Sequence, residues 1–270
     1  RTQTNIRMYS LLSLQKLLNI TLLYNHGFKI SKIASLEEGE IPIMVRDIAL
    51  KSSSEQVAIN ALKLAMVNFD YVMFDATFDE IASKYEFDYI FINIFMPLMK
   101  ELGILWQTGA ISPSHEHFIT NLVKQKIHIQ TELIQRKQAP QQNQKVFVLY
   151  LPENEIHELG ILFLNYYILA QNYKTIFLGQ SLTTESLQTV MTFSDNLTFV
   201  TYLTVEPNKE EINDYLKNFY ETILSGSQSN LNILGPLQTF INPSALPPQI
   251  KLHPTFESFR LEFFGEQIFV

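Results

Sequence analysis

The chain has 270 residues, 46% of them hydrophobic and 17% charged, which is enough apolar material for more than one folded core. It contains no cysteine, so disulfide bonds and thiolate metal sites are excluded. The longest apolar run, Tyr89 to Met99, is interrupted by Asn93 and Pro97 and is shorter than the roughly 20 residues that span a bilayer. No signal peptide is visible. We therefore expect a cytoplasmic protein without a membrane partner, which the absence of cysteine fits.

The charge of the chain is unevenly distributed. The net charge is −7, yet residues 1–36 hold five basic side chains and no acidic one, which leaves −12 on the remainder. A basic end on an acidic body suggests one region that meets a polyanion and another that does not. Chance clustering of five charges is the alternative interpretation.

Residues 1–52 form the first predicted segment. It begins extended or hairpin-like over residues 1–8, and a leucine-rich helix over 10–25 then ends at Gly27, a typical C-cap residue. A short second helix starts at Ile30, with Ile33 and Leu36 expected on the same face.

The second segment, residues 53–138, has apolar positions that recur every three and four residues and no alternating stretch. This periodicity predicts helices near 55–69, 73–85, 87–104 and 114–137, most simply an antiparallel four-helix bundle. The polar stretch from Arg136 to Lys145 separates two different patterns, so residues 139–145 are interpreted as a linker.

The third segment, residues 146–270, alternates short apolar runs with longer helical patterns. Strands are expected over 146–151, 175–179, 199–205 and 231–234, and helices over 156–171, 184–193 and 209–225. Such alternation is typical of βαβ units with a parallel sheet, which bind ligands at the carboxyl ends of their strands. Beyond Gln238 four prolines obscure the pattern.

A candidate ligand site follows the first strand of this third segment. His157 is predicted in the strand-to-helix turn, where an imidazole can coordinate a metal. Glu155 can hold its other ring nitrogen, and Gly160 would let a flat ligand approach the backbone. Taken alone, a lone histidine here more often caps the helix or lies at its surface.

Together with later residues, this motif resembles the cobalamin-binding fold, whose signature is Asp/Glu-x-His-x-x-Gly, then Ser-x-Leu, then Gly-Gly. Thr201 and Leu203 stand for the second element, with threonine in place of serine, and Gly235-Pro236 for the third. The resemblance implies a flavodoxin-like (Rossmann-like) domain in which His157 is the lower axial ligand of cobalt. The hydroxyl of Thr201 would then face the buried tail base of the cofactor.

The predicted bundle holds the only tryptophan, Trp106, followed nine residues later by Glu116-His117. This spacing is similar to that of the adenosylcobalamin-sensing CarH/LitR-type regulators of the MerR family. The resemblance implies that these three residues cap the adenosyl group of adenosylcobalamin. The histidine that follows the tryptophan in light-responsive members is Gln107 here, and glutamine is a poor cobalt ligand. A core tryptophan beside a solvated Glu-His pair is the alternative.

The first segment resembles the second half of a MerR-type winged-helix DNA-binding domain. Residues 1–10 look like the wing, and residues 25–33 like the next inter-helix turn and short helix. The recognition helix would precede Arg1, so we expect a longer natural protein. Arg1 and Arg7 are the candidate phosphate contacts, with Lys29 and Lys32 as further possibilities, although solvated surface charges are an equal alternative.

The resemblance implies a multidomain protein that combines helical and α/β parts. It would be a cobalamin-dependent, possibly light-responsive transcription regulator and not an enzyme. Cobalamin between the bundle and the α/β domain would control a homo-oligomer, dimer or tetramer, on DNA. Two alternatives stay open: a corrinoid methyl carrier, and a MerR-type regulator that keeps the fold without the cofactor.

Overall fold

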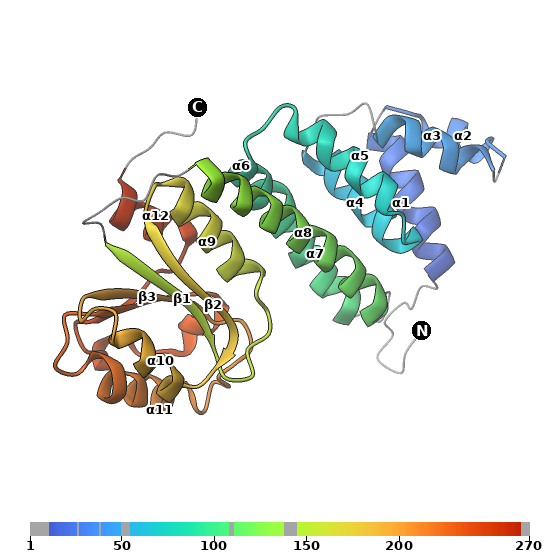
Figure 1. The fold of residues 1–270 in the computed structure, drawn as a ribbon. Coiled ribbons are helices and arrows are strands. Elements are labelled where there is room, and N and C mark those ends of the chain that lie inside the picture. The colour runs from blue at the N-terminus through green and yellow to red at the C-terminus, as the bar shows by residue number, and fades with distance from the viewer. Residues whose placement is uncertain are drawn as a thin grey trace. The chain divides into compact units, whose positions relative to one another are not determined.

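The computed structural model describes residues 11–25, 27–37, 39–49, 55–107, 111–137 and 145–265. It divides into two compact units, residues 1–126 and 127–270, and each is treated by itself below (Figure 1). The predicted wing with Arg1 and Arg7, and residues 139–144 of the predicted linker, lie outside the described residues.

The first unit is helical. Its elements are α1 (Leu11–Asn25), α2 (Ile30–Ala34), α3 (Glu40–Ala49), α4 (Glu55–Asn68), α5 (Tyr71–Ala82), α6 (Phe87–Ile90), a π-helical turn (Phe91–Phe95), α7 (Met96–Gln107) and α8 (Pro113–Lys137). The four predicted helical stretches of the bundle are therefore confirmed, with α6, the π-helical turn and α7 forming the third. Helix α8 continues across the boundary into the second unit.

Helix α4 is the centre of this unit, because every residue from Val57 to Val67 is buried. The stretch Phe87–Trp106 is long and apolar enough to cross a membrane by composition. Its buried side chains, including Phe91, Phe95 and Leu98, fill a core in which the ring of Phe95 stacks on those of Phe74 and Phe78. A core helix of a folded unit passes the same test of length and composition, so this stretch is only weak evidence for a membrane span.

The N-terminal helices join this core. Gly27 ends α1 with a φ of +84°, and the N–H groups of Gly27 and Phe28 return to carbonyls of the last turn, which confirms the predicted C-cap. Leu22 and Leu23 of α1 are fully buried, and α1 contacts both α3 and α4. Residues 11–49 thus pack on the bundle, whereas the sequence suggested a separate segment ending at residue 52.

Two details of this N-terminal region differ from expectation. Ile33 is buried, but Ile30 is 60% exposed, so the proposed common face of the short helix α2 is wrong at that position. Ile30 is the first residue of α2, and Ile33 is the residue that this helix buries. Helix α3 was not predicted.

The second unit is a parallel sheet with helices on both faces (Figure 1). The strand order is β2-β1-β3-β4-β5, all parallel, which is the flavodoxin-like order. This confirms the predicted fold class for residues 146–270. The elements are β1 (Val146–Pro152), α9 (Leu159–Ala170), β2 (Lys174–Leu182), α10 (Thr184–Met191), β3 (Leu197–Tyr202), α11 (Ile212–Phe219) with a π-helical turn (Tyr220–Leu224), β4 (Asn230–Leu234), 3₁₀ turns (Pro236–Phe240, Pro243–Ala245), β5 (Ile250–Leu252) and α12 (Phe256–Phe264).

Alternating side chains of β1 divide the interior of this unit into two cores. Phe147, Leu149 and Leu151 pack with α9 and α12. Val148 and Tyr150 pack with α10 and α11 on the other face. Because both faces are covered, β1 is apolar along its whole length and lacks an alternating polar pattern.

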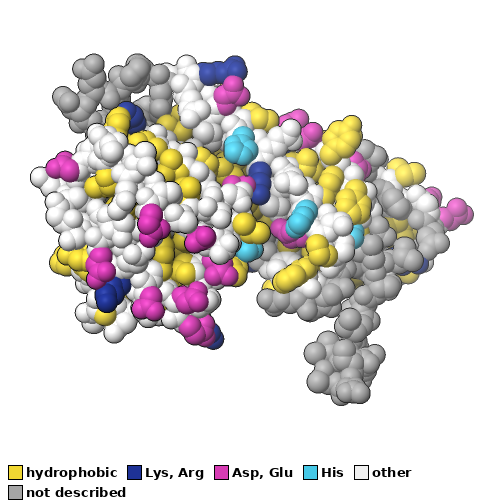
Figure 2. Space-filling view, turned by 60° about the horizontal axis from the view of Figure 1, so that its bottom comes forward, with side chains coloured by type: hydrophobic (Ala, Val, Ile, Leu, Met, Phe, Trp, Pro, Cys, Tyr) yellow, Lys and Arg dark blue, Asp and Glu magenta, His cyan; other side chains and the backbone are white. Residues whose placement is uncertain are grey.

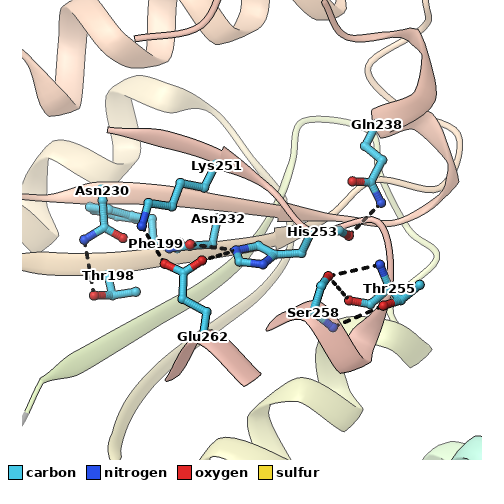
Figure 3. A network of polar contacts seen from close by, with 10 residues as sticks. All are labelled: Thr198, Phe199, Asn230, Asn232, Gln238, Lys251, His253, Thr255, Ser258 and Glu262. Carbon is cyan, nitrogen blue, oxygen red and sulfur yellow. Dashed lines mark hydrogen bonds and ion pairs between the residues drawn. The ribbon is translucent and has the colours of Figure 1, made fainter. Parts of the chain in front are cut away.

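The segment beyond Gln238, where the sequence pattern was unclear, contains β5 and α12 and is fixed by a buried polar network (Figure 3). The Nδ2 of Asn232 donates to the carbonyl of Phe199, so its Oδ1 is left to accept from Nε2 of His253 at 2.9 Å. His253 is 3% exposed, and the carboxylate of Glu262 lies 4.0 Å from its Nε2.

This network predicts a dependence of stability on pH. Burial lowers the pKa of His253 below its ordinary 6.5. The carboxylate of Glu262 raises this pKa by a smaller amount, and the charge of Lys251 lowers it further. The unfolded chain therefore takes up the proton first, and the free energy of unfolding falls as the pH drops below 6.5. We expect urea melts of the His253→Gln variant to show a smaller loss between about pH 7.5 and 5.5 than the wild type.

Burial also lowers the pKa of His115, so this residue too lowers the free energy of unfolding as the pH falls. The His253→Gln substitution should therefore reduce the dependence of stability on pH without abolishing it. A slope equal to that of the wild type would contradict this assignment.

Candidate functional site at the carboxyl ends of β1 and β3

The site lies where the strand order of the sheet reverses. Strands β1 and β3 are neighbours, and the chain leaves them toward opposite faces, α9 on one and α11 on the other. In open α/β sheets this switch point is where the loops diverge and ligands bind. Residues 153–158 follow β1 here, and residues 203–206 follow β3.

Glu155 joins these two loops. Its carboxylate is completely buried, and its Oε2 accepts hydrogen bonds from the backbone N–H groups of Thr204, Val205 and Glu206, at 2.7 to 3.0 Å. Its Oε1 accepts from the backbone N–H of His157 at 2.8 Å and lies 2.6 Å from Nδ1 of the same residue. The buried charge is thus surrounded by donors from both loops, which is the condition under which a carboxylate can stay buried.

The hydrogen bonds decide the protonation state of Glu155. Burial by itself raises the pKa of the carboxyl, but the N–H groups of Val205, Glu206 and His157, together with the His157 ring, outweigh it and leave the pKa below its ordinary value. The ionised carboxylate can only accept, so Nδ1 of His157 carries the proton.

Nε2 of His157 is consequently left outside the contact with this carboxylate, and the side chain is 52% exposed. An imidazole fixed through one nitrogen and open at the other is the usual arrangement of a metal-binding histidine. The predicted pairing of Glu155 with His157 is therefore confirmed, whereas the metal itself remains a prediction.

The helix after β1 begins at Leu159, three residues later than the sequence indicated. Asn154 has a φ of +65° and donates its N–H to the hydroxyl of Ser181, near the end of β2. The Glu155 side chain folds back onto its own loop. These contacts use backbone groups that a longer helix would need, so residues 153–158 form a loop.

Gly160 packs against a residue of β3. A Cβ at this position would lie 2.7 to 2.8 Å from the ring of Tyr202, which packs against the first turn of α9. The glycine therefore makes room for a tyrosine of β3, whereas the approach of a ligand to its backbone stays a prediction. The contact with Tyr202 could not be read from spacing, because Tyr202 is 42 residues away in the chain.

Leu203 and Gly235 are brought together at the ends of β3 and β4. Gly235 has a φ of +99°, and a Cβ there would lie 2.3 Å from the carbonyl oxygen of Leu203. Leu203 donates its N–H to the carbonyl of Leu234 and accepts from Leu237, so its backbone is held immediately before the loop bound by Glu155. The glycine supports the site through backbone packing.

Thr201 is fully buried, and its hydroxyl oxygen has no hydrogen-bond partner. An unpaired buried polar group costs free energy, so a ligand that hydrogen-bonds it would be favoured. Together with the open Nε2 of His157 on the neighbouring loop, this donor set fits a corrinoid, which offers a metal and polar groups.

Tyr150 lies near Thr201 and was missed by the sequence analysis. Leu149 of β1 and Val200 of β3 are the last pair of neighbours between these strands, and Tyr150 and Thr201 are the next residues on each. It is fully buried, stacks on Phe219 and shares a hydrogen bond of 2.6 Å with the Tyr215 hydroxyl. Burial raises the pKa of both phenols, so the pair stays protonated.

The residues predicted to cap a ligand lie in the first unit. Trp106 is at the end of α7 and 55% exposed. Glu116 and His117 are in the first turn of α8, with 3.4 Å between the carboxylate and Nε2. Among the described residues no contact links Trp106 to this pair, so their common role stays a prediction.

Phe69, between α4 and α5, was not found from the sequence. It has a φ of +53°, which is rare for a bulky residue, and is 47% exposed. Its ring stacks on buried His115 at 4.6 Å, and the N–H of Ser112 donates to Nδ1 of that histidine. His115 is thus buried within the unit, whereas His117 is exposed.

The surface charge agrees with the acidic body expected from the sequence. Figure 2 shows acidic side chains spread over the face of the second unit that it presents, with few lysines or arginines among them. A surface of this sign does not attract a nucleic-acid backbone. Any DNA contact must therefore come from elsewhere in the protein.

Comparison with known families gives a match over part of the chain. Residues 58–129, in the helical part, match the family described as B12 binding domain. This part of the chain is thus similar to a B12-binding domain. No match is found among curated proteins.

Three solved structures are similar to the chain to different degrees. The monomethylamine corrinoid protein of Methanosarcina barkeri superposes with a TM-score of 0.61 at 13% identity, over 77% of this chain and 98% of that one. A methanol:cobalamin methyltransferase complex from the same organism has a TM-score of 0.34 at 12% identity, over 84% and 87% of the two chains. A cobalamin-binding protein from Desulfitobacterium hafniense has a TM-score of 0.33 at 14% identity, over 67% and 88%. Only the first of these three likenesses is high enough to show a shared fold.

Proposed function

We propose that the chain is the sensor part of a cobalamin-dependent transcription regulator, most similar to the CarH/LitR type of the MerR family. The observation that carries the proposal is the clamp of Glu155 on His157, which leaves Nε2 open at the switch point of the sheet. In this proposal His157 holds the cobalt, and Thr201, Leu203 and Gly235 form the wall of the site.

Bound cobalamin, as adenosylcobalamin, would supply a cobalt–carbon bond that light can break. Trp106, Glu116 and His117 would shield that bond from solvent. We propose that the protein is not an enzyme.

The proposal of DNA binding rests on the N-terminal sequence. Residues 1–10 and 25–33 resemble the wing and the following helices of a MerR domain, and Lys29 and Lys32 lie on the exposed surface after α1. Arg1 and Arg7 would contact phosphates. In this proposal the ligand changes the state of a cytoplasmic homo-oligomer, dimer or tetramer, and thereby its occupancy of DNA.

A corrinoid methyl carrier is the second candidate. It is favoured by the likeness to a corrinoid protein, which covers 98% of that chain and includes the helical unit. A carrier would need neither a basic N-terminal segment nor a shielding tryptophan. Incubation of the methylcobalamin-loaded protein with a thiol acceptor, and assay of the methylated thiol, distinguishes it from a regulator.

The deciding experiment is a dark titration of the protein with adenosylcobalamin, followed by absorbance spectra and size-exclusion runs before and after blue-green light. We expect a spectrum typical of histidine ligation, with loss of that spectrum in His157→Ala, because no other group is held open at this point. The matched control is His128→Ala, an exposed histidine on α8 that has no role in the proposed site, and it should keep the spectrum.

A fall in mass on illumination would support a light-responsive regulator, whereas binding without a change in mass would support a B12 sensor of another kind. No binding would overturn the cofactor assignment and leave a regulator that keeps only the fold. A spectrum unchanged in His157→Ala would overturn the assignment of His157 as the cobalt ligand.

A further inference from the structure

The side chain of Thr201 points into the core that α10 and α11 cover. Thr201 is paired in the ladder with Ile233 of β4, which belongs to that core, whereas the next residue, Tyr202, packs in the core on the other face. Successive side chains of a strand alternate between the two faces of a sheet. Thr201 therefore shares its core with Tyr150, the residue at the corresponding place on the neighbouring strand β1.

This core contains an aromatic cluster, which consists of Tyr150, Phe199, Tyr215 and Phe219. The ring of Tyr150 stacks on that of Phe219, with 5.7 Å between the centroids, and Phe199 meets both rings edge-on at 6.2 and 5.5 Å. The phenol of Tyr215, on α11, completes the cluster through its hydrogen bond with the hydroxyl of Tyr150. Tyr150, Phe199 and Phe219 have no exposed surface, so the space between β1, β3 and α11 is filled.

The aromatic cluster bears on how a cobalamin would fit. The resemblance to the cobalamin-binding fold places the tail base of the cofactor beside the hydroxyl of Thr201, and that hydroxyl is buried. A bicyclic base could reach it only by displacing a ring of a close-packed core and by separating the two tyrosine hydroxyls. The loop of His157 thus fits the metal of a corrinoid, whereas the core behind Thr201 does not fit the tail.

We infer that the site binds the corrin ring of its ligand and leaves the nucleotide tail in solvent. The inference rests on the proposed function and names the class of ligand, corrinoids for which the tail is dispensable, including incomplete corrinoids that lack it. Tyr150 determines this specificity, because its ring occupies the place of the base. His157 must displace the tail base from the cobalt of cobalamin, and burial of that base does not offset the cost here. An incomplete corrinoid has no base to displace.

The test compares adenosylcobalamin with adenosylcobinamide, which has the same corrin and upper ligand but no nucleotide tail. Absorbance titrations of the full chain in the dark give both dissociation constants. We expect adenosylcobinamide to bind at least as tightly as adenosylcobalamin. Tighter binding of adenosylcobalamin would overturn the inference and leave the proposed function standing, whereas binding of neither compound would overturn both.

Two variants test the role of Tyr150. Tyr150→Ala opens the core, and it should shift the ratio of the two dissociation constants toward adenosylcobalamin by roughly tenfold, because part of the base can then be buried. Tyr150→Phe keeps the ring and is the matched control, which should retain the wild-type ratio. Thermal melts establish that each variant is folded, and an unchanged ratio in folded Tyr150→Ala would overturn the inference.

A second opening of the same core covers the case in which Tyr150→Ala does not fold. Tyr215 is half-buried, so Tyr215→Ala removes less of the core and leaves the rings of Phe199 and Phe219 in place. We expect the same direction of shift toward adenosylcobalamin. No shift in the folded Tyr215→Ala variant would contradict the assignment of the aromatic cluster as the barrier to the tail.

Discussion

Replacement of Glu155 by alanine should lower the free energy of unfolding by about 3 kcal/mol or more and release His157 from its fixed orientation. The carboxylate accepts from four backbone N–H groups and lies against a ring nitrogen, all within two loops that otherwise share few contacts. Its removal leaves buried donors without a partner, and the loop after β3 is no longer tied to the loop after β1.

Urea unfolding of Glu155→Ala measures this effect, and Glu153→Ala is the matched control. Glu153 lies two residues earlier on the same loop and is exposed, so its loss should change stability by no more than about 0.5 kcal/mol. Similar destabilisation by both variants would contradict the role assigned to Glu155.

The same carboxylate predicts the behaviour at low pH. Because its pKa is lowered in the folded state, its stabilising contribution is complete above the ordinary carboxyl pKa and is lost as the pH falls through the lowered value. The stabilities of wild type and Glu155→Ala should therefore converge at acid pH. If the proposed function is correct, Glu155→Ala should also weaken cobalamin binding by roughly 10- to 100-fold, as the loss of a group that orients a metal ligand does.

Replacement of Gly235 by alanine should cost about 4 kcal/mol, through two effects that add. The backbone conformation, with φ +99° and ψ 166°, is accessible essentially to glycine alone. The new Cβ would also lie 2.3 to 2.8 Å from backbone atoms of Leu203, which cannot move as a side chain can. The end of β4 would have to separate from the end of β3, and the hydrogen bond from Leu203 to Leu234 would be lost.

Gly226→Ala separates the two contributions. Gly226 has a φ of +78°, but no atom lies within 4 Å of the position of its Cβ. This variant should therefore show the backbone strain alone, about 1 kcal/mol. Thermal or urea melts give the free energy of unfolding of both variants. An equal loss in the two would mean that the contact of the new Cβ with Leu203 does not destabilise the protein.

The sequence determined the elements that depend on neighbouring residues. The helices of the first unit follow from apolar residues repeated every three and four positions, and the parallel sheet from short apolar runs between helices. The pairing of Glu155 with His157 could be predicted as well, because two residues in one turn are bound to be close. Gly27 was recognised as a helix end for the same local reason.

The tertiary structure alone decided which distant residues meet. The order of the strands places β3 beside β1 and β4 beside β3. Three contacts depend on this order: Glu155 with the N–H groups of residues 204–206, Gly160 with Tyr202, and Gly235 with Leu203. The stacking of Phe69 on His115 is likewise a contact between segments far apart in the chain. The burial of the Thr201 hydroxyl without a partner also depends on the segments that surround it. Periodicity indicates which face of an element is apolar, but the packing of the whole unit decides which partner covers that face. The site residues could therefore be named from the sequence, whereas the contacts that each of them makes could not.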